Sequence, residues 1–194
     1  MAYNITLEGK NKVIAERMLK NIAAILDHCK MDYWLEGGTL LGIIRENRLL
    51  PWDNDIDMSI NHDQLDKLDD LYSELKKAGY RVRTRRFGNT NDFFTKGAVR
   101  MIKIREKRFF GLMKGAVCLD LFIKYKYKGD SYWEINHITK SVPSKHYHTF
   151  RHIIFKGNKY KIPSLAEEYL TCRYGDWQKQ VKNWNTFKDD NAIT

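Results

Sequence analysis

The stretch WLEGGTLLGIIRENRLLPWDNDIDMSI, residues 34–60, carries two adjacent glycines followed by three aspartates at every second position, Asp53, Asp55 and Asp57. Carboxylates at this spacing repel one another unless water separates them or a positive charge lies between them. A metal ion, a basic side chain and bulk solvent are therefore the three candidates for what surrounds these side chains. The neighbouring sequence decides among them.

The end of this stretch has the period of a β-strand. From residue 55 to residue 60 polar and apolar side chains alternate, so Asp55, Asp57 and Ser59 share one face and the apolar side chains share the other. Two carboxylates one residue apart on a strand then point to the same side. Taken alone, such a pair is ordinarily solvated surface, so its neighbours in the fold must show whether it has a further role.

Hydrophobic periodicity predicts the other elements, working outward from this strand. Helices are expected over residues 11–29, from Thr39 onward and over residues 164–174. A further helix is expected to begin at a cap formed by Asn61, with Gln64 at the capping-box position, and to end at Gly79. Strands are expected over residues 33–36, 80–86, 98–104 and 117–123. Because strands occur in consecutive pairs as well as between helices, we predict an α+β fold, a small mixed β-sheet flanked by helices.

Two features bear on how the aspartates are interpreted. Gly37-Gly38 predicts a tight turn between a strand and a helix, where backbone N–H groups can approach a phosphate. Asp120 lies in the apolar strand VCLDLFI, opposite its apolar neighbours, and burying it requires a partner such as an arginine or a bound cation. A phosphate-binding turn beside three carboxylates is typical of a site for Mg²⁺ and a phosphorylated substrate. This combination favours a metal ion between the aspartates.

The whole chain has the size and charge of one globular domain with an anionic partner. Its 194 residues are 43% hydrophobic and carry a formal net charge of +10, so we expect a single compact domain over residues 1–194. Nucleotide, nucleic acid, phosphorylated glycan and an acidic membrane surface all fit that charge. The polar N-terminus, the short apolar runs and three scattered cysteines predict a reduced, cytoplasmic setting without a membrane span.

The densest group of basic residues lies in one predicted strand. Arginines alternate on one face of the strand predicted over residues 80–86, at Arg81, Arg83 and Arg85. The simplest interpretation is that these arginines form solvated surface. The functional alternatives are that they bind an acidic acceptor, make peripheral contact with an anionic membrane surface or bind an RNA backbone, and there is no strong case for nucleic acid. Five tryptophans add the option of a cation–π wall for a choline head group, although most tryptophans of a domain lie in its core.

Four motifs follow one another along the chain. The first and longest is GGTLLGIIR, residues 37–45, continued by PWDNDID, residues 51–57. The other three are MIKIR (101–105), CLDLF (118–122) and IP…YL…YGDW between residues 162 and 177. In this order they resemble the signature of the LicD and fukutin-related family, and the resemblance is strongest over residues 33–177.

The resemblance implies a nucleotidyltransferase fold of the polymerase-β type. It also implies transfer of a phospho-alcohol, such as phosphocholine or a polyol phosphate, from a CDP-linked donor to a sugar hydroxyl of a glycan or glycolipid acceptor, with release of CMP. Mg²⁺, or Mn²⁺ in its place, is the implied cofactor. Carried over position by position, the catalytic and metal-binding residues are Asp55, Asp57 and Asp120, with Asp53 as an additional candidate. The residues expected to contact the donor phosphates are Gly37, Gly38, Thr39 and Arg45, and a surface salt bridge is the alternative for the arginine.

Two other functions are open on the same residues. Attack at the proximal phosphorus of an NTP would transfer NMP and release pyrophosphate, and the carboxylates serve this reaction equally well. A catalytically silent basic module that binds nucleic acid or an anionic surface is the alternative from another class. The clustered carboxylates argue against such a module, because it gains nothing from a negative site.

Overall fold

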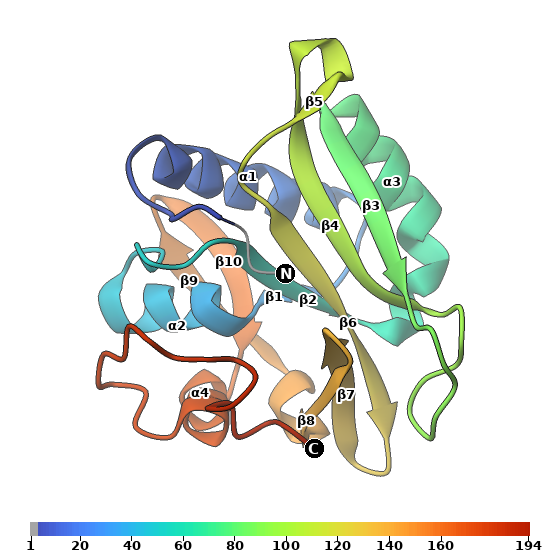
Figure 1. Cartoon of the computed structure of the whole chain (residues 1–194), viewed down its shortest axis with the longest axis vertical. Coiled ribbons are helices and arrows are strands. Elements are labelled where there is room, and N and C mark those ends of the chain that lie inside the picture. The colour runs from blue at the N-terminus through green and yellow to red at the C-terminus, as the bar shows by residue number, and fades with distance from the viewer. Residues whose placement is uncertain (1–3) are drawn as a thin grey trace.

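The computed structural model describes residues 4–194, and it confirms the predicted α+β fold with a mixed sheet flanked by helices (Figure 1). The α-helices are α1 (Gly9–His28), α2 (Gly37–Glu46), α3 (Leu68–Lys77) and α4 (Ala166–Tyr174). Three short 3₁₀ turns join other elements: η1 (His62–Lys67), η2 (Phe109–Gly111) and η3 (Ser144–Tyr147).

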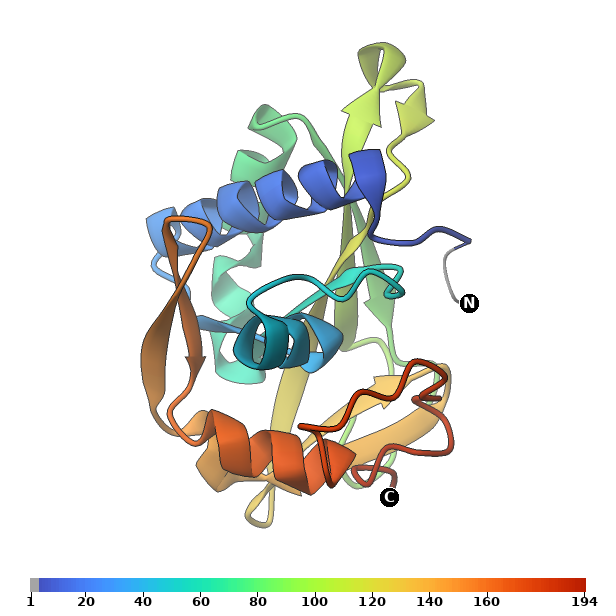
Figure 2. The same cartoon turned by 90° about the vertical axis from the view of Figure 1, so that its left-hand side faces the viewer.

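The strands form one large sheet and one separate hairpin. The strands are β1 (Tyr33–Leu35), β2 (Ile56–Asn61), β3 (Tyr80–Arg86), β4 (Val99–Arg108), β5 (Met113–Lys114), β6 (Leu119–Tyr127), β7 (Asp130–Ile135), β8 (Ile138–Pro143), β9 (Phe150–Phe155) and β10 (Asn158–Pro163). The central order is β1-β2-β6-β4-β3, and β5 extends β4 while β7 and β8 extend β6. Only the β2–β6 pair is parallel among the described pairs. The hairpin of β9 and β10 forms its own two-stranded sheet, which contacts β1 and lies beside α1 and α4 (Figure 2).

The apolar face of the central strands forms the core. Alternate residues of β2, among them Ile56 and Met58, are fully buried, as are Leu119 and Leu121 of β6. Helix α1 contacts α3 and β6, and α3 contacts β3, so these two helices cover that face. The opposite face of the same strands is therefore left for their polar residues, and residues of the first turn of α2 and of the C-terminal segment line the same cleft as these polar residues.

Among the helices within residues 4–194, none combines the length and the apolar character that a bilayer crossing requires.

Two predictions about local structure need correction. Helix α2 begins at Gly37 rather than near Thr39, although the φ of +55° at Gly37 keeps the predicted tight turn after β1. Asn61 ends β2 without a side-chain capping bond, and η1 intervenes before α3. Gln64 makes no capping box, since its side-chain amide bonds the backbone N–H and carbonyl of Asp32 at 2.6 and 2.8 Å.

Candidate active site

The polar face of the sheet forms the floor of a large cleft. The cleft has a volume of about 1550 Å³ and is lined by the first turn of α2, the aspartate segment, strands β3, β4 and β6, and the C-terminal segment. Pockets for one small ligand usually measure about 300–1,000 Å³. This cleft therefore has room for a donor and an acceptor together.

A row of charged side chains crosses four neighbouring strands at the bottom of the cleft. In the sheet register, Arg83 of β3 pairs with Lys103 of β4, which pairs with Asp120 of β6, which pairs with Asp57 of β2. Registered residues point to the same face of a sheet, and neighbouring strands lie about 4.8 Å apart. The row therefore changes from cationic to anionic over a few strand spacings, and the parallel β2–β6 pair places two of the predicted catalytic carboxylates side by side.

The two glycines hold the carboxylates close to the start of α2. A Cβ atom on Gly37 would lie 2.5 Å from Asp57 Oδ2, and one on Gly38 would lie 2.1 Å from Asp53 Oδ2. Gly37 also has a φ of +55°, in the left-handed region that favours glycine. A side chain at either position would therefore displace the neighbouring carboxylate, and at Gly37 it would also strain the backbone.

The aspartate carboxylates repel one another in this arrangement. Burial raises the pKa of Asp53 to about 6. Burial, and then the charges of Asp53 and Asp120, hold the pKa of Asp55 well above its usual range. Burial and the charges of Asp55 and Asp53 do the same to the pKa of Asp57. The fold therefore brings together more negative charge than its own cations balance at these three positions, and a bound cation would relieve the excess.

The residues fit a metal ion that shares its ligands with a substrate. Among residues 4–194, no three His, Cys, Asp or Glu side chains are arranged so that they alone could hold a metal. Mg²⁺ does not require such a set, because it is usually held by one or two carboxylates together with waters and substrate phosphates. Lys103 Nζ lies 2.5 Å from Asp120 Oδ2, so a cation already neutralises one member of the row. Asp55 and Asp57 are thus the best candidates for a Mg²⁺ ion in this geometry.

The other predicted donor-binding residues are placed differently. Thr39 is buried, and its hydroxyl accepts a hydrogen bond from Asp57 N at 2.9 Å, so it joins α2 to β2. Arg45 borders the cleft, and it pairs with Glu46 at 2.6 Å and donates to the carbonyl of Trp177 at 3.0 Å. Arg45 thus forms an ion pair in the wall of the cleft, with its side chain only 10% exposed rather than on the open surface, and its contact with the donor stays a prediction.

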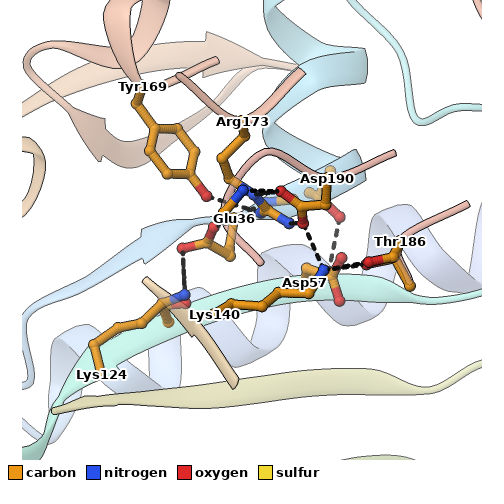
Figure 3. A network of polar contacts seen from close by, with 12 residues as sticks. Glu36, Asp57, Lys124, Lys140, Tyr169, Arg173, Thr186 and Asp190 are labelled. Carbon is orange, nitrogen blue, oxygen red and sulfur yellow. Dashed lines mark hydrogen bonds and ion pairs between the residues drawn. The ribbon is translucent and has the colours of Figure 1, made fainter. Parts of the chain in front are cut away.

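A buried ionic network beneath the cleft escaped prediction from the sequence (Figure 3). Arg173 of α4 donates to Glu36 Oε1 at 3.1 Å and forms an ion pair with Asp190. Lys140 Nζ of β8 lies 2.6 Å from Asp190 Oδ2, and Lys124 Nζ of β6 lies 3.4 Å from Glu36 Oε2. These five residues are at most 4% exposed. They come from distant parts of the chain, so no local pattern could have predicted them.

Glu36 connects this network to the catalytic strands. Its carboxylate accepts hydrogen bonds from Trp34 Nε1 at 3.0 Å and Ser59 Oγ at 2.9 Å, in addition to its bond with Gly37 N. Although burial alone would raise the pKa of Glu36, the charges of Lys124 and Arg173 lower it. A charged Glu36 therefore fixes the first turn of α2 against β2, next to the residues predicted to approach the donor.

The C-terminal segment closes one side of the cleft. Beyond α4, the chain returns along the cleft and is attached through Asp190 and through a β-bridge between Ile193 and Lys140. Four of the five tryptophans line the cleft, Trp52, Trp133, Trp177 and Trp184. Trp34 and Trp133 are buried in the core, and Trp52 and Trp177 are partly buried and pack against it, which fits the expectation that most tryptophans belong to the core. The C-terminal segment and the aspartate segment nevertheless bring edges of these rings to the cleft.

Comparisons with known proteins identify a matching family model and several relatives. A protein-family model described as LicD/FKTN/FKRP, nucleotidyltransferase domain, matches residues 30–164. An uncharacterized protein of Rickettsia prowazekii is 24% identical over 181 residues, which is 93% of this chain and 59% of that protein. The lipopolysaccharide cholinephosphotransferase LicD of Haemophilus influenzae is 29% identical over 75 residues, 39% of this chain and 28% of that protein. The human ribitol-5-phosphate transferase FKTN is 27% identical over 181 residues, 88% of this chain and 34% of that protein.

The chain thus spans about half the length, or less, of these curated relatives. Among solved structures, ANT(2")-Ia in complex with adenylyl-2"-tobramycin matches with a TM-score of 0.44 and 17% identity, covering 90% of this chain and 83% of that chain.

Proposed function

Because this chain belongs to the LicD/FKTN/FKRP family of nucleotidyltransferase domains, we propose that it is a metal-dependent phosphotransferase. It moves a phospho-alcohol from a CDP-linked donor to a sugar hydroxyl of a glycan or glycolipid and releases CMP. Two of the relatives are named as a cholinephosphotransferase and a ribitol-5-phosphate transferase, so a phosphocholine or a polyol phosphate is the transferred group.

The observation that carries the proposal is the charged row that crosses the cleft floor. Asp57 and Asp120 are registered neighbours on a parallel strand pair, and Asp55 precedes the same strand. The N-terminus of α2, which has no side chain on its first two residues, lies against Asp57. Anionic phosphates are stabilised at such a terminus. The cleft thus combines a place for phosphate with carboxylates that need a cation.

The chain's residues divide the reaction among them. The first turn of α2 binds the donor diphosphate, and the acceptor hydroxyl attacks the distal phosphorus in line while the bond to the bridging oxygen breaks and CMP leaves. The hydroxyl proton passes to a carboxylate oxygen of Asp120, which Lys103 orients at 2.5 Å. A Mg²⁺ ion held by Asp55 and Asp57 would neutralise the donor phosphates and lower the pKa of the acceptor hydroxyl when bound.

The aromatic lining favours phosphocholine among the candidate groups. Trp52, Trp177 and Trp184 border the cleft near the aspartate segment and the C-terminal segment. The face of an indole ring attracts a quaternary ammonium group, and each such contact contributes about 0.5–2 kcal/mol. A polyol phosphate would use hydrogen bonds instead, so CDP-choline is the first donor to test.

Thermal unfolding with Mg²⁺ tests the donor directly. CDP-choline, CDP-ribitol, CDP-glycerol, CTP and ATP are compared on the wild-type chain, on Asp57→Asn and on Asp66→Asn, a matched change at an exposed aspartate. A donor at about 100 times its Kd stabilises the native state by about 2.7 kcal/mol. We expect metal-dependent stabilisation by one CDP-alcohol, kept in Asp66→Asn and lost in Asp57→Asn.

Product identification then separates the two reactions that the carboxylates could serve. Release of CMP from the stabilising CDP-alcohol supports phospho-alcohol transfer. Stabilisation by NTPs alone, with pyrophosphate as product, would replace the proposal with nucleotidyl transfer. No response to any of these ligands, together with salt-sensitive RNA binding that survives Asp57→Ala, would favour a silent basic module.

A further inference from the structure

The hairpin between β4 and β5 carries a cluster of exposed apolar side chains. Phe110 is fully exposed, and Leu112, Phe109 and Met113 are 84%, 68% and 56% exposed. Exposed apolar residues on soluble proteins usually occur singly, and a contiguous group marks an interaction site. Figures 1 and 2 both show this hairpin projecting beyond the rest of the molecule, so its tip can reach a flat surface without obstruction.

The backbone of the tip directs these side chains outward. Phe109 and Phe110 have φ values of +49° and +55°, a region that bulky residues rarely occupy. Below the tip, β4 and β5 pair through Lys107 with Lys114 and Arg108 with Met113. A short paired stem thus presents two aromatic rings at its end, in a conformation that glycine or asparagine would adopt more easily.

Positive charge surrounds the apolar cluster. Lys107, Arg108 and Lys114 form the stem beneath it, and all three are exposed. Phenylalanine and leucine next to lysine and arginine are the combination that inserts into the head-group region of an anionic membrane. A second copy of this chain is a poorer partner, because two tips would bring their cationic stems together and each chain carries a net charge of +10.

We propose that the β4–β5 tip, residues 107–114, docks the protein on the surface of an anionic lipid bilayer. The rings of Phe109 and Phe110 and the side chain of Leu112 enter the interface, and the cationic stem binds lipid phosphates. Each lysine or arginine near such a surface increases affinity about fivefold, and a buried phenylalanine increases it at least about tenfold.

Docking in this way places the catalytic cleft at the membrane. Leu112, Met113 and Lys114 belong both to the hairpin and to the lining of the cleft. A cleft whose rim rests on the bilayer receives an acceptor that is anchored in lipid. This last consequence rests on the proposed function, whereas the docking itself requires no donor, metal or turnover.

Flotation with vesicles tests the docking on the full chain. Vesicles of phosphatidylcholine alone are compared with vesicles of phosphatidylcholine and phosphatidylglycerol in equal parts. The variants are Phe110→Ser and Lys114→Gln at the tip, with Ile154→Ser and Lys156→Gln as controls on the separate β9–β10 hairpin, where Ile154 is 64% exposed. Because the tip residues are exposed, unchanged thermal unfolding should confirm that each variant folds.

We expect the wild-type chain to float with the anionic vesicles, Phe110→Ser to lose at least about tenfold in affinity and Lys114→Gln about fivefold, with the control variants unchanged. Anionic binding that Phe110→Ser retains and salt abolishes would overturn insertion of the tip. An absence of vesicle binding, with concentration-dependent self-association that Phe110→Ser removes, would assign the tip to a second copy. Failure of CDP-alcohols to bind would leave each of these outcomes unchanged.

Discussion

At the scale of single residues, the two glycines of α2 do more than allow a turn. Each has a carboxylate oxygen where its Cβ atom would be, Asp57 against Gly37 and Asp53 against Gly38. The glycine pair therefore controls where two of the cleft's negative charges lie. From the sequence, the pair could be predicted to approach a phosphate, but its contact with the aspartates depends on the crossing of α2 and the segment before β2.

Replacing Gly38 with alanine should displace the carboxylate of Asp53 and lower activity. The new Cβ would lie 2.1 Å from Asp53 Oδ2. Because that oxygen ends a short side chain that can rotate away, the free energy of unfolding should fall by only about 1 kcal/mol. Transfer rates and urea unfolding measure the two effects, and Gly88→Ala, at a glycine with open space around it, is the control.

The variant Asp53→Ala decides what the displacement means. An equal loss of activity in Gly38→Ala and Asp53→Ala assigns the effect to the carboxylate. If Asp53→Ala keeps full activity while Gly38→Ala loses it, the alanine instead blocks the approach of the donor to the backbone, and Asp53 has no part in the site.

At the scale of elements, strand period and register account for most of the site. Alternation along residues 55–60 correctly predicted which side of β2 carries Asp57, and the apolar neighbours of Asp120 did the same for β6. The parallel pairing that places these two residues side by side is a property of chain topology, which periodicity does not contain. The four strands β7–β10 were missed for a related reason, since their alternation is interrupted by polar and aromatic residues.

Removal of the positive charge of Lys103 should tighten Mg²⁺ binding. Lys103 reaches Asp120 Oδ2 at 2.5 Å from the neighbouring strand, so its charge opposes a second cation at the same row. For Lys103→Met we expect the Mg²⁺ concentration at half-maximal donor-induced stabilisation to fall about fivefold, the equivalent of about 1 kcal/mol of relieved repulsion. Lys126→Met makes the same change at an exposed position of β6 outside the cleft and should alter nothing.

A higher Mg²⁺ requirement in Lys103→Met would contradict this reasoning. It would mean that the lysine holds the carboxylate of Asp120 in the orientation that the metal needs, and that orientation outweighs repulsion. At saturating Mg²⁺ a folded variant regains the full donor-induced stabilisation, whereas a misfolded variant does not. The maximal stabilisation therefore distinguishes this case from misfolding.

At the scale of the whole molecule, four regions far apart in sequence meet in one buried ionic network. Glu36 precedes α2, Lys140 lies on β8, Arg173 lies in the last turn of α4 and Asp190 belongs to the C-terminal segment. Apolar patterning can predict which elements fold, but it gives no account of buried charges, because their cost of burial is offset only by partners that the tertiary structure supplies. This is why Glu36 and Arg173 were absent from the predicted site although both line the cleft.

The network makes a prediction about stability and pH through Asp190. Although burial would raise it, the charges of Arg173 and Lys140 lower the pKa of Asp190 to about 2, from 3.8. A carboxyl group whose pKa is lowered on folding stabilises the native state at every pH above its pKa in the unfolded chain. This contribution of about 2 kcal/mol is lost as the pH falls from about 4 to about 2. Asp190→Asn should remove this part of the acid dependence and, at pH 7, cost about 3–5 kcal/mol, because it takes the carboxylate partner from buried Lys140 and leaves Arg173 with Glu36 alone.

Urea unfolding of the wild-type chain, Asp190→Asn and Asp189→Asn at pH 7, 4 and 2.5 measures both effects. Asp189 is the exposed neighbour, and its Oδ2 accepts a hydrogen bond from Asn185 N at 2.6 Å. Because the side-chain oxygen of asparagine can accept the same bond, Asp189→Asn should follow the wild-type curve closely. The wild-type advantage over Asp190→Asn should be largest at pH 7 and should shrink by about 2 kcal/mol toward pH 2.5. An advantage that stays constant with pH would mean that Asp190 acts through hydrogen bonding alone, and the C-terminal segment would then be attached to the cleft wall without a net electrostatic contribution from this carboxylate.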